Sequence, residues 1–430
     1  MFDTQNGKPI ANPTAILVGL ETDQSEDFDH SMEEMLLLID ACNIEVVSAI
    51  TQKLPHPEAG TYLGSGKVKE LAEEATSQQA TYCIFEGNLS PAQLKNIQKE
   101  VGAEIWDRTT LILEIFSRRA KTKEARLQVE SAYLQYMLPR LSGMWQHLGR
   151  QSGGSGSKSN KGIGETQLEL DRRQIKQRMA ELSKELDVIS KTRATQRQGR
   201  MKGNLPRVAM VGYTNAGKST LLNKMLELNE SEEEKKVFQK DMLFATLDTS
   251  IRHINFEGNK DFLLSDTVGF IEKLPHQLIK AFRSTLEEAI HANLILVVLD
   301  ASDEYYRQHK KVTEDTLKEL SADEIPRIYV MNKADLIEEV KNSLPKIKED
   351  EIWISAENKV GLNELIKMIT DKVYAGNQIL NIKLPFAKGD LLNRLHTQAK
   401  IIKEDYDAQG TILEVECPEY LIGEVKDFII

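Results

Sequence analysis

Over the first 116 residues, short apolar runs alternate with stretches in which apolar residues recur every three or four positions. The apolar runs, which are rich in β-branched and aromatic residues, cover residues 15–20, 44–50, 81–86 and 104–107. The stretches with helical spacing lie between them, around residues 32–40, 68–75 and 91–100. Strands that alternate with helices form parallel sheets, because each helix returns the chain to the same edge of the sheet. The pattern predicts a small parallel α/β N-terminal domain over residues 1–116.

A different spacing follows this domain, with leucines seven residues apart at Leu127, Leu134 and Leu141. A second apolar stripe, beyond a glycine-rich stretch, comprises Leu168, Ile175, Met179, Leu182, Leu186 and Ile189. Its steps of seven, four, three, four and three residues place these side chains on one helix face, and two such faces close in sequence pack together. We therefore expect an antiparallel coiled-coil helical hairpin over residues 117–200, with the glycine-rich segment 141–164 as its tip.

Beyond residue 200 the α/β pattern returns and then gives way to a short region of a different kind. A glycine-containing break that ends in Pro206 precedes the second α/β region, which we place at residues 201–375. A joint marked by Pro385 and two β-like runs characterise the last segment, residues 376–430. We expect this segment to form a short α+β C-terminal domain.

The composition is that of an ordinary globular chain of 430 residues, with 40% hydrophobic and 28% charged residues. No apolar run approaches the roughly 20 residues of a membrane-spanning helix, and the first residues lack the pattern of a signal peptide. The three cysteines, Cys42, Cys83 and Cys417, show no metal-binding spacing. We therefore expect a cytoplasmic protein with no integral membrane association.

Charge is distributed unevenly along the chain. The total is −11 at pH 7, yet residues 117–207 contain 20 lysines and arginines against 8 acidic residues, a net charge of +12. The rest of the chain therefore carries −23. A basic segment on an acidic chain is either a solvated helix face or a surface that binds a polyanion, and an asymmetry of this size favours nucleic acid as a partner.

One short motif carries phosphate-binding chemistry. The pattern G-x-x-x-x-G-K-[ST] follows an apolar strand, opens a helical stretch and is followed by Thr220. Its residues are Gly212, Tyr213, Thr214, Asn215, Ala216, Gly217, Lys218 and Ser219. The glycines let backbone N–H groups curl around a phosphate at the positive end of a helix. In such a P-loop, Lys218 reaches the β- and γ-phosphates and the Ser219 hydroxyl binds Mg²⁺.

Two later segments select GTP rather than ATP. An apolar strand ends in D-x-x-G at Asp266 and Gly269, where the carboxylate acts on Mg²⁺ through water and the amide meets the γ-phosphate. The pattern N-K-x-D follows at Asn332, Lys333 and Asp335. A carboxylate at Asp335 accepts two hydrogen bonds from guanine that adenine cannot donate, so a site built around these bonds rejects ATP.

A fourth segment completes the set with an S-A pair, Ser355 and Ala356, whose backbone can meet the guanine O6. Four motifs in this order, each after an apolar strand, predict a P-loop GTPase domain with a mixed sheet and helices on both faces. The expected reaction is the hydrolysis of GTP to GDP and phosphate.

The stretch between the first two motifs must sense the γ-phosphate. Its sequence FATLDTS offers Thr246 and Thr249 as hydroxyl ligands of Mg²⁺, unless both simply lie in a β-strand. We choose Thr246, because the ATLD run resembles the switch sequence of translation-associated GTPases. The expected switch I segment comprises Phe244, Ala245, Thr246, Leu247 and Asp248.

One position departs from the common GTPase pattern. Many GTPases carry a glutamine after D-x-x-G that orients the attacking water, whereas this chain has Phe270, which cannot hydrogen-bond water. We expect slow intrinsic hydrolysis unless a partner surface positions the water or a K⁺ ion at Asn215 does so. Asn215 serves equally as a local turn former. The prediction is a partner-stimulated switch whose catalytic group is unassigned.

A second glycine-rich stretch, residues 64–67, reads G-S-G-K and is half of a phosphate loop. A glycine turn that opens a helix explains it without a ligand. If it binds ATP instead, the chain would be an RNA-remodelling ATPase or helicase with a second nucleotide site in its N-terminal domain.

The order of these features resembles the HflX family of ribosome-associated GTPases. The resemblance rests on LGSGKVKEL in the N-terminal domain, on residues 107–141, on GETQLELDRRQI after the tip and on the GTPase motifs, and it covers nearly the whole chain. The tip departs from the family's GGxGxRGPGE-like run, because this chain reads GGSGSKSNKGIGE, with Lys161 and Ile163 at the positions of an Arg and a Pro.

The resemblance implies a monomer that binds GTP or GDP and, with Mg²⁺, the large (50S) ribosomal subunit, its hairpin reaching 23S rRNA near the peptidyl-transferase region. It further implies ribosome-stimulated hydrolysis and the splitting or rescue of stalled or idle 70S ribosomes under stress. A GTP-dependent factor that silences ribosomes without splitting them is an alternative. The residues expected to contact rRNA are Arg118, Arg119, Lys121, Arg126, Trp145, Arg150, Lys158, Lys161, Arg172 and Arg173.

Overall fold

The chain forms two compact units in the computed structural model, one built largely from residues 1–195 and the other from residues 196–430. The structure describes residues 4–5, 8–9, 12–24, 27–141, 160–201, 205–228, 250–255, 260–267, 269–270 and 289–430. Side chains are described over the same ranges except for residues 4–5, 8–9, 160–168 and 193–201.

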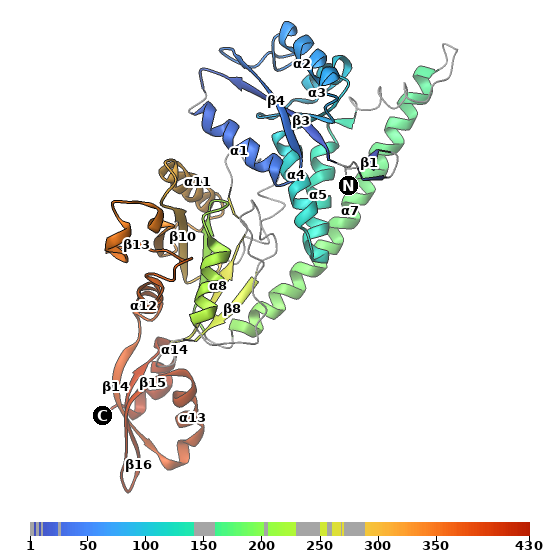
Figure 1. Ribbon diagram of the computed structural model, residues 1–430. Coiled ribbons are helices and arrows are strands. Elements are labelled where there is room, and N and C mark those ends of the chain that lie inside the picture. Colours follow the sequence, from blue (N-terminus) through green and yellow to red (C-terminus); the bar gives the residue numbers. More distant parts are fainter. Residues whose placement is uncertain are drawn as a thin grey trace. The chain divides into compact units, whose positions relative to one another are not determined.

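The first unit contains a four-stranded parallel sheet in the order β4-β3-β5-β6. Its strands are β3 (Thr14–Glu21), β4 (Glu45–Lys53), β5 (Tyr82–Phe85) and β6 (Glu104–Asp107), and two short strands precede them, β1 (Thr4–Gln5) and β2 (Lys8–Pro9). The helices between the strands are α1 (Phe28–Asp40), α2 (Ser65–Ser77) and α3 (Pro91–Glu100) (Figure 1). Ile16, Val18 and Leu20 of β3 are buried against α2 and α3. The predicted parallel α/β sheet is confirmed.

Three further helices follow, α4 (Arg108–Arg119), α5 (Lys123–Met137) and α7 (Asn160–Met201). The sequence pattern did not predict α4, which begins directly after β6 because Asp107 caps it and accepts a hydrogen bond from the Thr110 amide at 2.9 Å. Ala120 ends α4 in an extended conformation. Thr122 then caps α5, the helix that carries Leu127 and Leu134 of the predicted leucine repeat.

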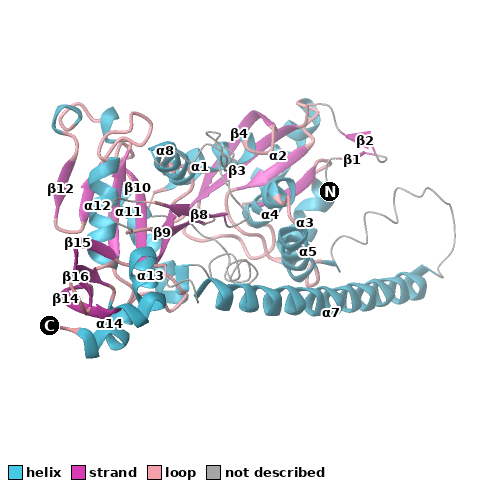
Figure 2. Ribbon diagram, turned by 90° about the horizontal axis from the view of Figure 1, so that it is seen from below, coloured by secondary structure: helices cyan, strands magenta, loops and turns pink. Residues whose placement is uncertain are grey.

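α7 runs along α5 (Figure 2), and Arg178 of α7 forms an ion pair with Glu130 of α5. Leu182 is fully buried and Ile175 half-buried, whereas Val188, which lies outside the stripe, is exposed. Arg178 of α7 donates two hydrogen bonds, at 2.7 and 2.9 Å, to the carboxylate of Glu130 on α5. A bidentate pair of this kind fixes the relative orientation of the two helices as well as attracting them.

The second unit contains a seven-stranded mixed sheet in the order β12-β13-β11-β10-β7-β9-β8, in which the edge strands β8 and β12 are antiparallel to their neighbours. Its strands are β7 (Arg207–Gly212), β8 (Ser250–Ile254), β9 (Phe262–Asp266), β10 (Leu294–Asp300), β11 (Arg327–Asn332), β12 (Lys346–Lys348) and β13 (Glu351–Trp353). Its helices are α8 (Lys218–Leu228), α11 (Tyr306–Glu319) and α12 (Leu362–Val373), with 3₁₀ turns at Ala334–Leu336 and Lys341–Ser343. Fully buried apolar strands at the centre of this sheet confirm the predicted mixed α/β fold.

The C-terminal segment of this unit forms a three-stranded antiparallel sheet in the order β14-β16-β15 (Figure 1). Its elements are β14 (Gln378–Pro385), α13 (Gly389–Gln398), β15 (Lys400–Tyr406), β16 (Gly410–Cys417) and α14 (Glu419–Val425), with 3₁₀ turns at Phe386–Lys388 and Lys426–Phe428. Lys260, which precedes β9, forms an ion pair with Glu416 of β16 at 2.8 Å. The Tyr374 hydroxyl donates to the carbonyl of Asp261. These contacts join the small sheet to the larger one.

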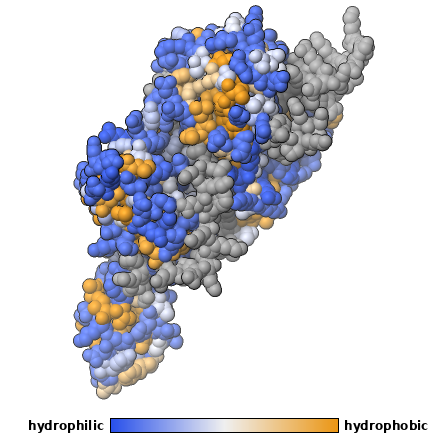
Figure 3. Space-filling view, viewed as in Figure 1, coloured by the Kyte–Doolittle hydropathy of each residue, from blue (hydrophilic) through white to orange (hydrophobic). Residues whose placement is uncertain are grey.

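Hydrophilic side chains cover most of the face shown in Figure 3, and apolar side chains gather in separate patches. Among the described residues, the exposed large apolar side chains include Leu37 of α1 and Tyr406 of β15. No helix in the described part of the chain is long and apolar enough to cross a membrane.

Candidate GTP-binding site

The P-loop connects the end of β7 to the start of α8. Gly212 has a φ of +148°, and a Cβ on it would lie 2.1 Å from the backbone oxygen of Val298 on β10. Gly217 has a φ of +89°, and its Cβ would lie 2.2 Å from the side-chain nitrogen of Asn332. Both positions require glycine, because backbone conformation and neighbouring atoms exclude a side chain. The loop is therefore fixed by β10 and β11 as well as by its own turn.

The charged groups of the P-loop and of β9 lie close together. Lys218 is buried, and its ammonium donates to the carbonyls of Gly212 at 2.9 Å and Tyr213 at 2.7 Å. Burial lowers the pKa of Lys218 to about 8, and the charge of Asp266 opposes this shift. The Ser219 hydroxyl donates to the carboxylate of Asp266 at 2.7 Å. A hydroxyl and a buried carboxylate are hard oxygen donors, so this pair fits the Mg²⁺ that P-loop GTPases use.

Phe270 is bound to the P-loop through its backbone. Its amide donates to the Gly212 carbonyl at 3.0 Å, and its carbonyl accepts from the Thr214 amide at 2.9 Å. The side chain is only 3% exposed. A Cβ on Gly269 would lie 3.0 Å from the ammonium of Lys218, so the chain after β9 approaches the P-loop lysine closely. The ring of Phe270 thus fills a packed position and has no polar atom with which to hold a water molecule.

Asn215 is exposed and has a φ of +62°, in the left-handed region that asparagine tolerates better than most residues. This conformation suits the turn-forming role that the sequence allowed for it. The alternative role, coordination of K⁺, stays a prediction.

The predicted guanine-binding motifs meet at the other end of the P-loop. Asn332 is 2% exposed, and its amide donates to the carbonyl of Ala216 at 3.0 Å while its oxygen accepts from the amide of Ala356 at 3.0 Å. The side chain therefore ties the N-K-x-D segment to both neighbouring motifs. Because the Ala356 amide donates to Asn332 here, its assignment to guanine O6 stays a prediction, as does the role of Ser355, whose hydroxyl caps the following turn.

Two residues that the sequence did not single out position this end of the site. Asp300, at the end of β10, pairs with Lys333 at 2.7 Å. Lys333 itself has a left-handed φ of +57°. Asn358 donates from its side-chain amide to the carboxylate of Asp335 at 3.0 Å. A carboxylate directly after an apolar strand was a visible signal for Asp300, whereas nothing in the sequence distinguishes Asn358 from its neighbours.

An aromatic stacking contact joins the P-loop to α11. The ring of Tyr213 lies parallel to that of His309 on α11, with 3.8 Å between the ring centres and 13° between the planes. Both side chains are buried. The second P-loop residue is thus packed against the helix that follows β10, a contact that no local motif predicts.

Several predicted site residues lie outside the described residues. These are the switch I segment with Phe244, Ala245, Thr246, Leu247 and Asp248, and the tip residues Trp145, Arg150 and Lys158. Lys161 lies in α7, but its side chain is not among those described.

The other residues predicted to contact rRNA differ in how exposed they are and in whether they already interact with protein groups. Arg172 and Arg173 on α7 and Arg126 on α5 are exposed. Arg118 instead donates to Glu114 at 2.9 Å and to the carbonyl of Cys42, so this guanidinium stabilises the first unit. Arg119 is half-buried and Lys121 is exposed, and both have interactions with other groups.

The G-S-G-K stretch forms the turn that opens α2. The Gly64 amide donates to the side-chain oxygen of Gln52 at 2.9 Å, and Lys67 pairs with Glu70 at 2.8 Å. These contacts agree with the glycine-turn interpretation, since a backbone amide and an ammonium that a phosphate would need are bonded to protein groups.

Three family descriptions match consecutive parts of the chain. Residues 29–117 match the GTP-binding GTPase N-terminal family, residues 119–200 match the GTP-binding GTPase middle region, and residues 207–333 match the 50S ribosome-binding GTPase family. Together these matches span most of the first unit, α7 and the part of the nucleotide site from the P-loop to Lys333.

Known relatives extend the similarity over the whole chain. GTPase HflX from Caldanaerobacter subterraneus subsp. tengcongensis is 40% identical and covers 97% of this chain and 94% of its own length. GTPase HflX from Escherichia coli K12 is 38% identical, and the similarity covers 97% of this chain and 96% of the length of that protein. A crystal structure of a GTP-binding protein from Sulfolobus solfataricus with GDP is 25% identical, with a TM-score of 0.41 over 84% of this chain and 98% of that one. The chain is a GTP-hydrolysing enzyme and belongs to the HflX family of GTPases.

Proposed function

We propose that this GTPase is a nucleotide-controlled switch that binds the large (50S) ribosomal subunit and splits stalled or idle 70S ribosomes, especially under stress. The observation that carries the proposal is the presence in one chain of a complete set of GTP motifs and a long helix, α7, with exposed arginines. The match of residues 207–333 to a family described as 50S ribosome-binding GTPases supports the partner.

The nucleotide site supplies the switch. Lys218 would neutralise the β- and γ-phosphates, and Ser219 and Asp266 would hold Mg²⁺, with Thr246 as the expected third contributor. The ion supplies charge stabilisation where negative charge develops on the phosphate oxygens. Asp335, oriented by Asn358, would accept the two guanine donors.

Hydrolysis needs a water-positioning group that the position after Gly269 does not provide, since Phe270 is packed and apolar. We infer slow intrinsic hydrolysis that the ribosome stimulates, with K⁺ at Asn215 as an alternative device. Phosphate release would then lower the affinity for the ribosome and return the protein to the cytoplasm as a GDP-bound monomer.

The basic helical region supplies the contact with 23S rRNA. Arg172 and Arg173 lie exposed on α7, on which the tip segment would extend toward the peptidyl-transferase region. Such contacts neutralise phosphates and release counterions, so binding should weaken steeply as salt increases. Replacing Arg172 and Arg173 with Gln should reduce the slope of log affinity against log salt by about two.

Sedimentation with purified 50S subunits tests the partner. We expect the protein to pellet with the subunits when it holds a non-hydrolysable GTP analogue and to stay in the supernatant with GDP. Equal pelleting, or none, in both states would refute a nucleotide-controlled ribosome switch.

Light scattering of 70S particles tests splitting separately. The scattered intensity should fall after addition of the protein with the GTP analogue, because subunits scatter less than intact ribosomes. A constant signal combined with nucleotide-dependent pelleting would favour the alternative of a silencing factor that does not split ribosomes.

A further inference from the structure

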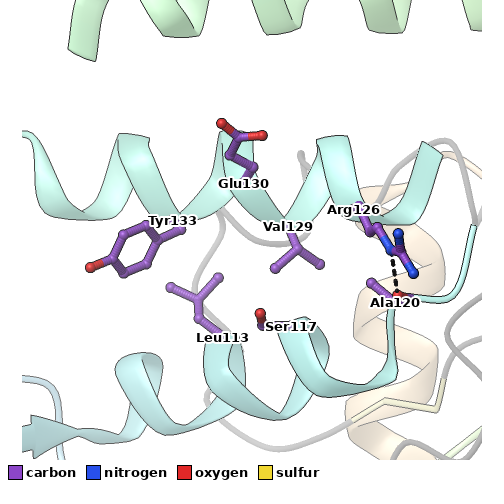
Figure 4. A pocket seen from close by; sticks show the side chains of 7 residues that line it. All are labelled: Leu113, Ser117, Ala120, Arg126, Val129, Glu130 and Tyr133. Atoms are coloured by element: carbon purple, nitrogen blue, oxygen red, sulfur yellow. Dashed lines mark hydrogen bonds between the residues drawn. The ribbon is translucent and has the colours of Figure 1, made fainter. Parts of the chain in front are cut away.

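A cavity of about 280 Å³ lies between α4 and α5, outside the nucleotide site. Leu113 and Val129, which face each other across it in Figure 4, are 1% and 5% exposed. Its acidic lining residue, Glu130, turns away from the cavity in Figure 4 and accepts the two hydrogen bonds from Arg178 of α7. This space therefore belongs to the packing of the helices, whereas contacts of the C-terminal sheet bear on the nucleotide site itself.

The strands β8 and β9 join the two segments that we expect to contact the γ-phosphate of GTP. They are antiparallel, and Ser250, the first residue of β8, pairs with Asp266, the last residue of β9. Ser250 follows the expected switch I segment, residues 244–248, by two positions, and Asp266 begins the D-x-x-G motif. β8 lies at the edge of the sheet and has β9 as its one neighbour among the described strands. The position of this strand pair therefore sets where both segments leave the sheet.

At its other end, this strand pair contacts the C-terminal segment. Lys260 pairs with Glu416 of β16 at 2.8 Å, and the two side chains are only 20% and 17% exposed. The side-chain amide of Asn377 donates to the same carboxylate at 3.4 Å. The Tyr374 hydroxyl donates to the Asp261 carbonyl, and burial raises the pKa of this hydroxyl, so it stays protonated and able to donate. Partial burial shields these contacts from water, so they restrain the strand pair more than a fully exposed ion pair would.

Both contacts come from elements that are themselves well held. β16 is the middle strand of the C-terminal sheet, and Glu416 lies between Ile379 of β14 and Lys400 of β15. Tyr374 caps the end of α12, whose Leu365 and Ile369 are buried in the core of the GTPase domain. A pull on Lys260 or on the Asp261 carbonyl is therefore resisted by a sheet and by a packed helix.

We propose that Lys260, Glu416 and Tyr374 are positioning residues for recognition of the γ-phosphate, through which the C-terminal sheet favours GTP over GDP. A segment that is ordered before binding loses less entropy on binding, so the affinity rises for the ligand that contacts it. GTP contacts the segments at the ends of β8 and β9 through its γ-phosphate, whereas GDP depends on the P-loop and the guanine-binding loops. The proposal rests on the γ-phosphate contacts in the proposed function and is independent of the ribosome.

Titration with fluorescent GDP and with a fluorescent non-hydrolysable GTP analogue, both with Mg²⁺, tests the proposal. Lys260→Gln should weaken binding of the analogue about 3- to 10-fold and change GDP binding by less than about twofold. Glu416→Gln should do the same, and the double variant should be no weaker than either single one, because both remove one contact. Tyr374→Phe should act in the same direction. Lys383→Gln, which breaks an ion pair with Asp407 inside the C-terminal sheet, is the matched control and should leave both affinities unchanged.

Two results would overturn the role of the C-terminal sheet. These are equal analogue affinities of Lys260→Gln and Lys383→Gln, and a loss of GDP affinity in Lys260→Gln as large as the loss for the analogue, which a general destabilisation would produce. Circular dichroism and thermal unfolding confirm that the variants are folded. Thr246→Ala separates this proposal from the proposed function. If it lowers the analogue affinity alone while Lys260→Gln does not, only the role of the C-terminal sheet is refuted. If neither does, the assigned γ-phosphate contacts fail as well.

Discussion

Asn332 joins the P-loop to the guanine-binding loops, and its replacement with Ala should both destabilise the GTPase domain and weaken nucleotide binding. The side chain is 2% exposed and makes one hydrogen bond to the Ala216 carbonyl and one to the Ala356 amide, each 3.0 Å long. Ala at this position removes both partners and leaves two buried backbone groups unsatisfied.

The expected cost follows from those two groups. A buried polar group that loses its partner costs about 1–3 kcal/mol, although water that enters the space left by the amide recovers part of this loss. We therefore expect the free energy of unfolding of the GTPase domain to fall by about 2–4 kcal/mol. The affinity for GDP should fall as well, because the P-loop and the loop around Ala356 lose their common support.

Unfolding in guanidinium chloride, monitored by the fluorescence of Trp353, measures the loss of unfolding free energy. Trp353 lies on β13 in the same sheet, and replacing Trp106 and Trp145 with Phe in every variant removes the other two indoles. Asn393→Ala on the exposed face of α13 is the matched control. If Asn332→Ala unfolds within about 0.5 kcal/mol of this control, which is the usual range of surface substitutions, the two hydrogen bonds do not stabilise the domain as argued.

Three further substitutions test other parts of the site. Gly217→Ala should abolish tight GDP binding, measured by fluorescence titration, because its Cβ would lie 2.2 Å from the amide of Asn332 at a φ of +89°. Asp335→Asn should lower GTP affinity at least about 100-fold by removing two charged hydrogen bonds, and a competition assay should show a gain for xanthosine nucleotides. Phe270→Gln should not accelerate single-turnover GTP hydrolysis and should lower the melting temperature, because position 270 is buried and its backbone is bonded to the P-loop.

The strands and the P-loop could be predicted because their signals are local. The apolar run before the P-loop, residues 208–211, reads directly as a buried strand, and it is buried in β7. The glycines of the P-loop are visible by spacing, and Gly212 and Gly217 prove to have the left-handed φ values that justify them. Local sequence carries this information because each of these features depends on a few adjacent residues.

The orientation of the site groups could not be predicted in the same way. Asn358 contacts Asp335 across 23 positions, and His309 stacks on Tyr213 across nearly a hundred, so no periodic pattern links them. α4 was missed for a related reason. Its cap, Asp107, is also the last residue of β6, and a strand that passes directly into a helix leaves no turn signal between them.

The position of Phe270 bears on which group positions the attacking water during GTP hydrolysis. Asp266 ends a strand in the interior of the sheet, and the backbone of Phe270 makes two hydrogen bonds with the P-loop, one to Gly212 and one from Thr214. The ring of Phe270 is 3% exposed and has no atom that could hydrogen-bond a water molecule opposite the γ-phosphate. We therefore infer that the group that positions the water comes from switch I, from an ion or from the partner. Hydrolysis that depends on a group outside the rigid sheet is hydrolysis that a partner can control.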